Sequence, residues 1–136
     1  MKVCGIEIKG SEAILVVLEG QKESFQVIDH EFKKIKLNDS RDQSQIQSFK
    51  NTVNSFLSSQ GIGKVGIKGK NAIGKFSGGT TSAKIEGLIQ TCDAQVTIVF
   101  PQTFNAAIKK SKVDIDDYGI NKYQEEAFKV AFSILV

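Results

Sequence analysis

The chain has 136 residues, a length typical of one domain that closes its own hydrophobic core. Its hydrophobic and charged fractions, 40% and 24%, exclude collagen-like and strongly disordered sequences. No apolar run approaches the roughly 18–20 residues that span a bilayer, and a net charge of +3 is too small to establish nucleic-acid binding.

The N-terminal segment is charged at Lys2 and Glu7, which is too early for a signal peptide. We therefore expect a cytoplasmic protein. Thiols stay reduced in that compartment, so Cys4 and Cys92 are expected to be structural and unbridged.

The first part of the chain alternates between apolar and polar residues as β-strands do. Three strands are predicted, over Met1–Lys9, Ala13–Leu18 and Ser24–Leu37, with a shift in phase near Asp29 in the third. Short turns separate them, so they are expected to form an antiparallel meander. The first strand places Cys4, Ile6 and Ile8 on one face and Val3, Gly5 and Glu7 on the other.

The rest of the chain alternates helices and strands. The predicted elements are a helix over Arg41–Ser59 that Asn38, Asp39 or Ser40 caps, a strand over Val65–Ile67, a helix carrying Ile85, Leu88, Ile89 and Cys92, a strand over Gln95–Phe100, a helix from Pro101 to Lys110, and a last helix over Asn121–Val136. This order predicts an α/β fold in one domain over residues 1–136. The domain would have a mixed five-stranded sheet, three antiparallel strands followed by strand–helix units, with helices on both faces.

This order is similar to that of the RNase H-like superfamily. Within it the chain resembles Holliday-junction resolvases of the RuvC type, and also an uncharacterised bacterial family of short proteins known only as a domain of unknown function. The resolvase pattern opens with Ile-Asp-x-Gly-Ser, where this chain has Ile6-Glu7-Ile8-Lys9-Gly10-Ser11. The second family acid follows an apolar residue on the fourth strand, where this chain has Lys68, or Gly69 if the register slips by one.

The last helix of the resolvases carries acids before small and apolar residues. The segment Tyr123-Gln124-Glu125-Glu126-Ala127-Phe128 matches this pattern, with Tyr123 where another acid can stand. Helical periodicity puts Glu126 on the face shared by Ala127 and Val130, so Glu126 is expected to point toward the first strand and Glu125 away from it.

The resemblance implies a metal-dependent nuclease site built from acids. Two-metal nucleases hold Mg²⁺ or Mn²⁺ ions roughly 3.5–4 Å apart, usually with three or four carboxylates. Here only Glu7 and Glu126 stand at matching positions. Two carboxylates about 5 Å apart repel by roughly 3 kcal/mol at an effective dielectric near 20, so a metal, a shared proton or a cation must relieve them.

Lys68 is the obvious candidate for this cation. We hypothesise that its ammonium occupies the space between Glu7 and Glu126 that a metal ion would take. A distance of more than about 6 Å from Lys68 to both carboxylates would contradict this hypothesis.

Five lysines and no acid lie between residues 64 and 84. These lysines are either solvated side chains on loops and helix ends or a basic rim for phosphates. Under the second interpretation, the phosphate-binding residues are Lys68, Lys70, Lys75 and Lys84. The glycine-rich loop over 69–81 precedes a helix N-terminus, which can receive an anion; its Phe76 either stacks on a base or anchors the loop.

Two functions remain open. The first, which the missing acid favours, is a non-catalytic or degenerate nuclease-like module that binds nucleic acid or a protein partner and needs no cofactor. The second is a Mg²⁺- or Mn²⁺-dependent, resolvase-like nuclease that uses Glu7 and Glu126 as catalytic and metal-binding residues, with Glu125 or Glu86 as further candidates.

The last helix is apolar nearly all round, because Phe128, Phe132 and Leu135 lie off its inner face. Either its own domain covers both sides of the helix, or these residues form a homodimer surface.

Overall fold

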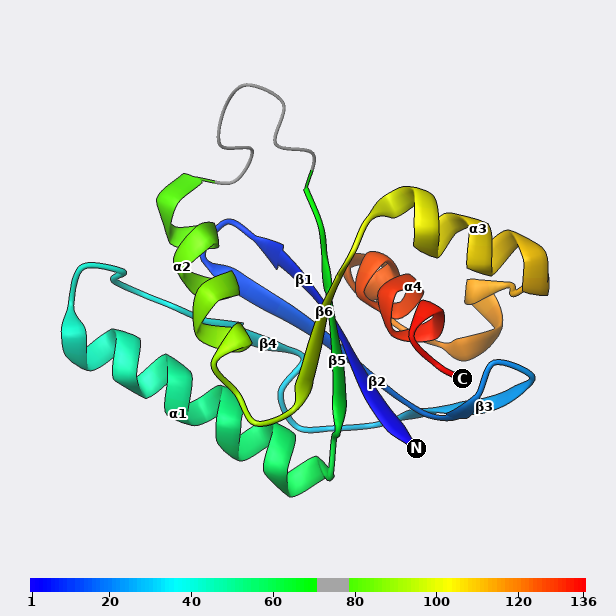
Figure 1. Ribbon diagram of the computed structural model, residues 1–136, viewed down its shortest axis with the longest axis horizontal. Helices are drawn as coiled ribbons and strands as arrows, with labels where there is room; N and C mark the ends of the chain where they lie inside the picture. The colour runs from blue at the N-terminus through cyan, green and yellow to red at the C-terminus, as the bar shows by residue number, and fades with distance from the viewer. Residues whose placement is uncertain (71–78) are drawn as a thin grey trace.

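Six strands form one mixed sheet in the computed structural model, which describes residues 1–70 and 79–136 (Figure 1). The strands are β1 (Lys2–Lys9), β2 (Glu12–Gln21), β3 (Ser24–Ile28), β4 (Lys34–Lys36), β5 (Lys64–Lys68) and β6 (Gln95–Val99). They are ordered β3-β2-β1-β5-β6, and β4 also pairs with β2. Strand β2 pairs antiparallel with β1, β3 and β4, whereas β5 and β6 continue the sheet parallel to β1. The predicted arrangement, with antiparallel strands first and strand–helix units after them, is confirmed.

The predicted third strand, Ser24–Leu37, is two strands, which gives the sheet six strands instead of five. β3 ends at Ile28 and β4 begins at Lys34, and both lie antiparallel to β2. A shift of one residue in alternation turns every later side chain to the other face. The shift in phase near Asp29 is therefore the point at which the chain leaves the sheet, before it pairs with β2 again.

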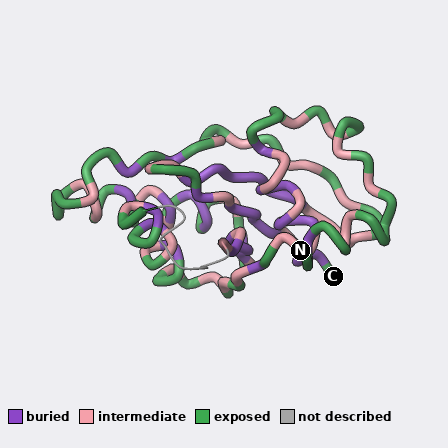
Figure 2. The backbone as a smooth tube through the Cα atoms, turned by 90° about the horizontal axis from the view of Figure 1, so that it is seen from above, coloured by how far each residue is buried: buried purple, intermediate pink, exposed green. Residues whose placement is uncertain are grey.

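Four α-helices cover the sheet within the described residues, and two 3₁₀ turns precede the last of them. They are α1 (Gln43–Gln60), α2 (Gly79–Gln90), α3 (Pro101–Ser111), η1 (Ile115–Tyr118), η2 (Lys122–Gln124) and α4 (Glu125–Ser133). Helices α1 and α2 lie on one face and α3 and α4 on the other (Figure 1), and each face has its own hydrophobic core. The buried residues follow the central strands between these layers (Figure 2). None of the described helices has the length and apolarity needed to cross a membrane.

Two helix starts differ from the prediction. Helix α1 begins after Asp42, whose carboxylate accepts a hydrogen bond from the backbone N–H of Ser44, so Asp42 is the cap rather than Asn38, Asp39 or Ser40. Helix α4 begins at Glu125 instead of Asn121, because the buried Gln124 side chain accepts from the N–H of Asn121 and donates to the carbonyl of Leu15. These bonds hold the first turn in a 3₁₀ form.

Helix α4 is covered on both sides by its own chain. Phe128 and Phe132 are completely buried. The ring of Phe25 lies 6.0 Å from Phe128 and 5.4 Å from Phe132, and the ring of Tyr118 lies 5.3 Å from Phe128. Leu135 is buried in the same core. The surface that suggested a homodimer through this helix is therefore absent, because β3 and η1 cover it.

Candidate functional site

Two glycines let α4 lie directly against the sheet. A Cβ atom added at Gly5 would come within 2.0 Å of the carbonyl oxygen of Ala127 and 2.5 Å of the backbone nitrogen of Ala131. Gly66, the partner of Gly5 in the β1·β5 register, would bring a Cβ within 2.7 Å of Val130 Cγ1. The backbone of α4 thus rests on β1 and its side chains pack on β5, and its first turn lies near the ends of both strands.

Four charged side chains meet at this place, and we call them the acid–lysine cluster: Glu7 of β1, Lys68 of β5, and Glu126 and Lys129 of α4. The Lys68 ammonium lies 3.3 Å from Glu7 Oε2 and 3.1 Å from Glu126 Oε1, so it bridges the two carboxylates. Lys129 Nζ lies 3.2 Å from the other oxygen of Glu126. The predicted position of Lys68 between the acids is confirmed, as is the inward direction of Glu126.

The cluster is partly shielded from water, with side-chain exposures of 13% for Glu7, 21% for Lys68, 24% for Lys129 and 33% for Glu126. Burial by itself lowers the pKa of Lys68, but the hydrogen bonds and charges of Glu126 and Glu7 outweigh it and raise that pKa above 10.5. Burial likewise favours a raised pKa for Glu126, and the two lysines outweigh it, holding that pKa below 4.5. Lys68 and Glu126 are therefore both charged at neutral pH.

The pKa shifts define the pH range over which the cluster stabilises the fold. Because the pKa of Glu126 is lowered on folding, its contribution is present above about pH 4.5 and is lost as the pH falls through the lower folded value. Because the pKa of Lys68 is raised, its contribution is present below about pH 10.5 and is lost as the pH rises through the higher folded value.

We expect Glu126→Gln to cost about 1 kcal/mol of unfolding free energy near neutral pH, a value discounted for the partial exposure of the side chain. The cost should shrink toward zero as the pH falls below 4.5 and through the lowered folded pKa, because the wild-type carboxylate then becomes protonated. Urea unfolding at neutral pH and at acid pH measures this. Glu125→Gln, one residue away and outside the ion pairs, is the control. An equal cost at both pH values would show that the effect comes from packing rather than charge.

The residues present do not fit a two-metal centre. The space between the two carboxylates holds the Lys68 ammonium, and no group of three or more acidic, histidine or cysteine side chains in residues 1–70 and 79–136 can hold a metal ion. At Tyr123, where another acid can stand in the resolvases, the aromatic ring lies 4.3 Å from the Lys34 ammonium.

Neither further acid joins the cluster. Glu86 belongs to α2, on the opposite face of the sheet from α4, and Glu125 forms no ion pair within the described part of the chain. Sequence reasoning missed Lys129 and Lys34. The spacing of Glu126 and Lys129, three residues apart on a helix, is a signal that would have found the first of them.

The predicted phosphate-binding lysines differ in their surroundings. Lys68 is held by the two carboxylates, and Lys84 donates a 2.6 Å hydrogen bond to the carbonyl of Ser40 before α1. Lys70 lies two residues after the end of β5 and is half-buried. Lys75 and Phe76 lie outside the described residues. Lys70 therefore follows the strand whose last residue, Lys68, belongs to a cluster of two acids and two lysines.

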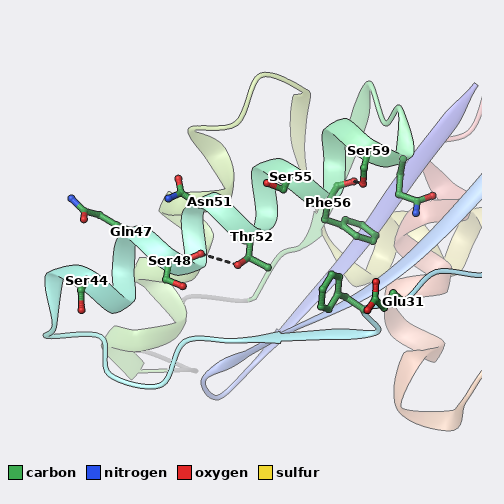
Figure 3. Close-up of a pocket in the computed structure, with 11 residues that line it drawn as sticks. Glu31, Ser44, Gln47, Ser48, Asn51, Thr52, Ser55, Phe56 and Ser59 are labelled. Atoms are coloured by element: carbon green, nitrogen blue, oxygen red, sulfur yellow. Dashed lines mark hydrogen bonds between the residues drawn. The ribbon is translucent and has the colours of Figure 1, made fainter.

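A separate hollow of about 680 Å³ lies between α1 and the segment after β3 (Figure 3). Its lining is mostly hydroxyl and amide side chains of α1, with Glu31, Phe32 and Phe56. Figure 3 shows Phe56 and Glu31 on opposite sides of it. It contains one carboxylate and no lysine or arginine, so its chemistry does not suit phosphate groups.

Comparison with solved structures identifies the fold. The RuvC structure of Thermus thermophilus gives a TM-score of 0.73 at 12% sequence identity and covers 98% of this chain and 92% of RuvC. T. thermophilus RuvC in complex with a Holliday junction substrate gives 0.70 at 11% identity, with 98% and 91% covered. The Holliday junction resolvase of fowlpox virus gives 0.53 at 13% identity, with 98% and 94% covered. The fold is RNase H-like and of the RuvC type, as predicted.

The chain belongs to the DUF3010 family of proteins of unknown function, whose family model matches residues 1–134. A search of curated proteins gives no match. The predicted resemblances to RuvC-type resolvases and to a family without an assigned function are both confirmed. Identities of 11–13% establish the fold alone, so the function is argued from the cluster itself.

Proposed function

We propose that this chain is a non-catalytic, nuclease-like module that binds nucleic acid at the strand ends beside the acid–lysine cluster. One observation carries the proposal: the Lys68 ammonium lies 3.3 and 3.1 Å from the only two acids at the expected catalytic positions. An ammonium there neutralises the carboxylates that would otherwise attract divalent cations. The cluster then serves to hold α4 against β1 and β5.

Two features support nucleic acid as the partner. Lys68 and Lys129 neutralise the charges of Glu7 and Glu126. A phosphate backbone would therefore meet less repulsion at this edge of the sheet. The RuvC and fowlpox structures of the same fold include complexes with Holliday junction DNA, which makes a four-way DNA junction the first probe. Lys70, and Lys84 on α2, supply the phosphate contacts in this proposal.

Fluorescence anisotropy with a labelled four-way junction and a duplex of matched length tests the binding. We expect the junction or duplex to bind with an affinity that falls steeply with salt. Lys70→Ala should reduce the slope of log affinity against log salt by about 1. The control is Lys50→Ala, which removes the same charge from the exposed side of α1 and should leave the slope unchanged.

Incubating the junction with the protein and Mn²⁺ or Mg²⁺ tests the absence of catalysis. No cleavage is expected. Cleavage that Glu7→Gln abolishes would overturn the proposal and establish the alternative, a divalent-metal-dependent nuclease that uses Glu7 and Glu126. If the protein neither binds nor cleaves the junction, the nucleic-acid part of the proposal is overturned, and the search moves to a protein partner.

A further inference from the structure

The sheet ends at β6, and no described strand pairs with the outer side of β6. In Figure 1 this strand lies across the centre of the view, with α2 on one side and α3 and α4 on the other. Gln95 and Thr97 are exposed, and Val96 and Ile98 are half-buried. An unpaired edge of this kind presents a row of backbone hydrogen-bonding groups to other chains.

The hydrogen bonds to β5 show which groups point outward. The N–H of Gln95 donates to the carbonyl of Gly63 at 3.0 Å, and the carbonyl of Val99 accepts from the N–H of Gly69 at 2.8 Å. In a parallel ladder, alternate residues turn both their polar groups to the same neighbour. Gln95, Thr97 and Val99 therefore face β5, and the N–H and C=O groups of Val96 and Ile98 point away from the sheet.

The opposite edge of the sheet is shared by β3 and β4, and its β4 part is protected in a way that β6 is not. There β4 has only three residues, and two of them are lysines, Lys34 and Lys36. Short edge strands and lysine side chains are common means of preventing unwanted strand pairing. The five residues of β6, Gln-Val-Thr-Ile-Val, include no charge and no proline, so nothing in the strand opposes a partner.

We propose that β6 is a homodimer interface in which a second copy of the chain adds its own β6 antiparallel, about a twofold axis at Thr97. The positions of the outward groups fit this symmetry. Val96 lies opposite Ile98 of the second copy and exchanges both hydrogen bonds with it, and Ile98 does the same with Val96, which makes four backbone hydrogen bonds. Thr97 lies opposite its own copy as a non-hydrogen-bonded pair, the kind in which side chains approach most closely.

A second copy suits this edge because the strand is neutral and complementary to itself. Each central pair is β-branched, either Val with Ile or Thr with Thr, and such cross-strand pairs stabilise sheets. A charged partner segment would find no opposite charge on β6. The twofold axis would place the two acid–lysine clusters at opposite ends of one continuous sheet, and the interface does not depend on the proposed nucleic-acid binding.

Sedimentation velocity of the full chain from about 1 µM to about 1 mM tests the proposal, because small interfaces give affinities within this range. We expect the mass to rise from 14.9 kDa toward twice that value. Thr97→Lys places two ammonium groups opposite each other and should weaken association at least about tenfold. Gln26→Lys, an exposed change of the same charge on β3, should leave it unchanged. A monomer at every concentration, or equal effects of the two variants, would overturn the proposal.

Cross-linking tests the register. In a Cys92→Ser background the remaining native thiol, Cys4, is fully buried. Thr97→Cys should then give a disulfide-linked dimer under mild oxidation, because only residue 97 faces its own copy within disulfide reach. Gln95→Cys, exposed on the same strand but opposite Val99 of the second copy, should give little. Equal cross-linking at both positions would exclude the proposed register, and a dimer with no cross-link at residue 97 would place the interface elsewhere.

Discussion

Lys68→Asp is expected to turn the acid–lysine cluster into a divalent-cation site. The substitution removes the ammonium that lies 3.3 Å from Glu7 and 3.1 Å from Glu126 and supplies a third carboxylate at the end of β5. Three carboxylates on neighbouring elements form the oxygen-rich site that Mn²⁺ and Mg²⁺ prefer. Without a metal, the repulsion between carboxylates about 5 Å apart, roughly 3 kcal/mol per pair at an effective dielectric near 20, should destabilise the variant.

Added Mn²⁺ should recover that loss. A cation that binds only the folded state stabilises it by about 2.7 kcal/mol at a concentration 100 times its dissociation constant. Thermal unfolding of the variant with Mn²⁺ and with a chelator measures the difference, and isothermal titration calorimetry gives the stoichiometry. The wild-type chain should show no matching rise in Tm, because the Lys68 ammonium already neutralises the acids.

Two variants separate a built site from a simple charge effect. Lys129→Asp makes the same change of charge beside Glu126, but Lys129 contacts only the outer oxygen of that carboxylate, so little Mn²⁺ response is expected. Lys68→Met removes the ammonium without adding a ligand and should respond weakly. A lack of Mn²⁺ response in Lys68→Asp would mean that the carboxylates do not converge. A strong response in the wild-type chain that Glu7→Gln abolishes would show that the ammonium is readily displaced.

The cluster was predictable from local patterns and one resemblance. The strand period put Glu7 on the same face as Gly5, the helix period put Glu126 on the same face as Ala127, and alignment with the resolvase pattern put Lys68 at the position of the second acid. The pairing of Lys34 with the Tyr123 ring was not predictable. It depends on β4 pairing with β2, which brings together residues about ninety positions apart, and no local pattern encodes that contact.

The prediction of the last helix shows the same limit. Helical periodicity showed that Phe128 and Phe132 lie off the inner face, but it did not show what covers them. The answer is the rings of Phe25 on β3 and Tyr118 on η1. Phe25 reaches the helix from a distant part of the sequence, and Tyr118 comes from a turn shortly before the helix. A local apolar pattern tells only that a surface must be covered, so it does not distinguish a homodimer from packing within the chain.

Gly5→Ala is expected to be among the most destabilising single substitutions in this fold. The new methyl group would lie 2.0 Å from the carbonyl oxygen of Ala127 and 2.5 Å from the nitrogen of Ala131. Both are backbone atoms of α4, so no side-chain rotation relieves the clash and the helix must move as a unit. Overpacking of a core typically costs 1–3 kcal/mol, and we expect about 3 kcal/mol or more here. Urea unfolding measures the cost.

Two other glycines calibrate this expectation. Gly66→Ala meets a side-chain methyl group, Val130 Cγ1, at 2.7 Å rather than backbone atoms and should cost less, about 1–2 kcal/mol. Gly87→Ala, in α2 with nothing within 4 Å of the new atom, should stabilise the chain by about 0.5–1 kcal/mol through helix propensity. A cost for Gly5→Ala below that of Gly66→Ala would show that α4 moves away from β1 without resistance.

Gly5→Ala also tests whether the contact between Gly5 and α4 keeps Glu126 in the acid–lysine cluster. If α4 moves outward in Gly5→Ala, Glu126 leaves the Lys68 ammonium and its pKa returns toward 4.5. The stability difference between Gly5→Ala and the double variant Gly5→Ala/Glu126→Gln should then lose most of its pH dependence, whereas the corresponding difference in the wild-type background keeps it. An undiminished pH dependence would mean that the ion pairs hold the first turn of α4 in place even when the glycine contact is lost.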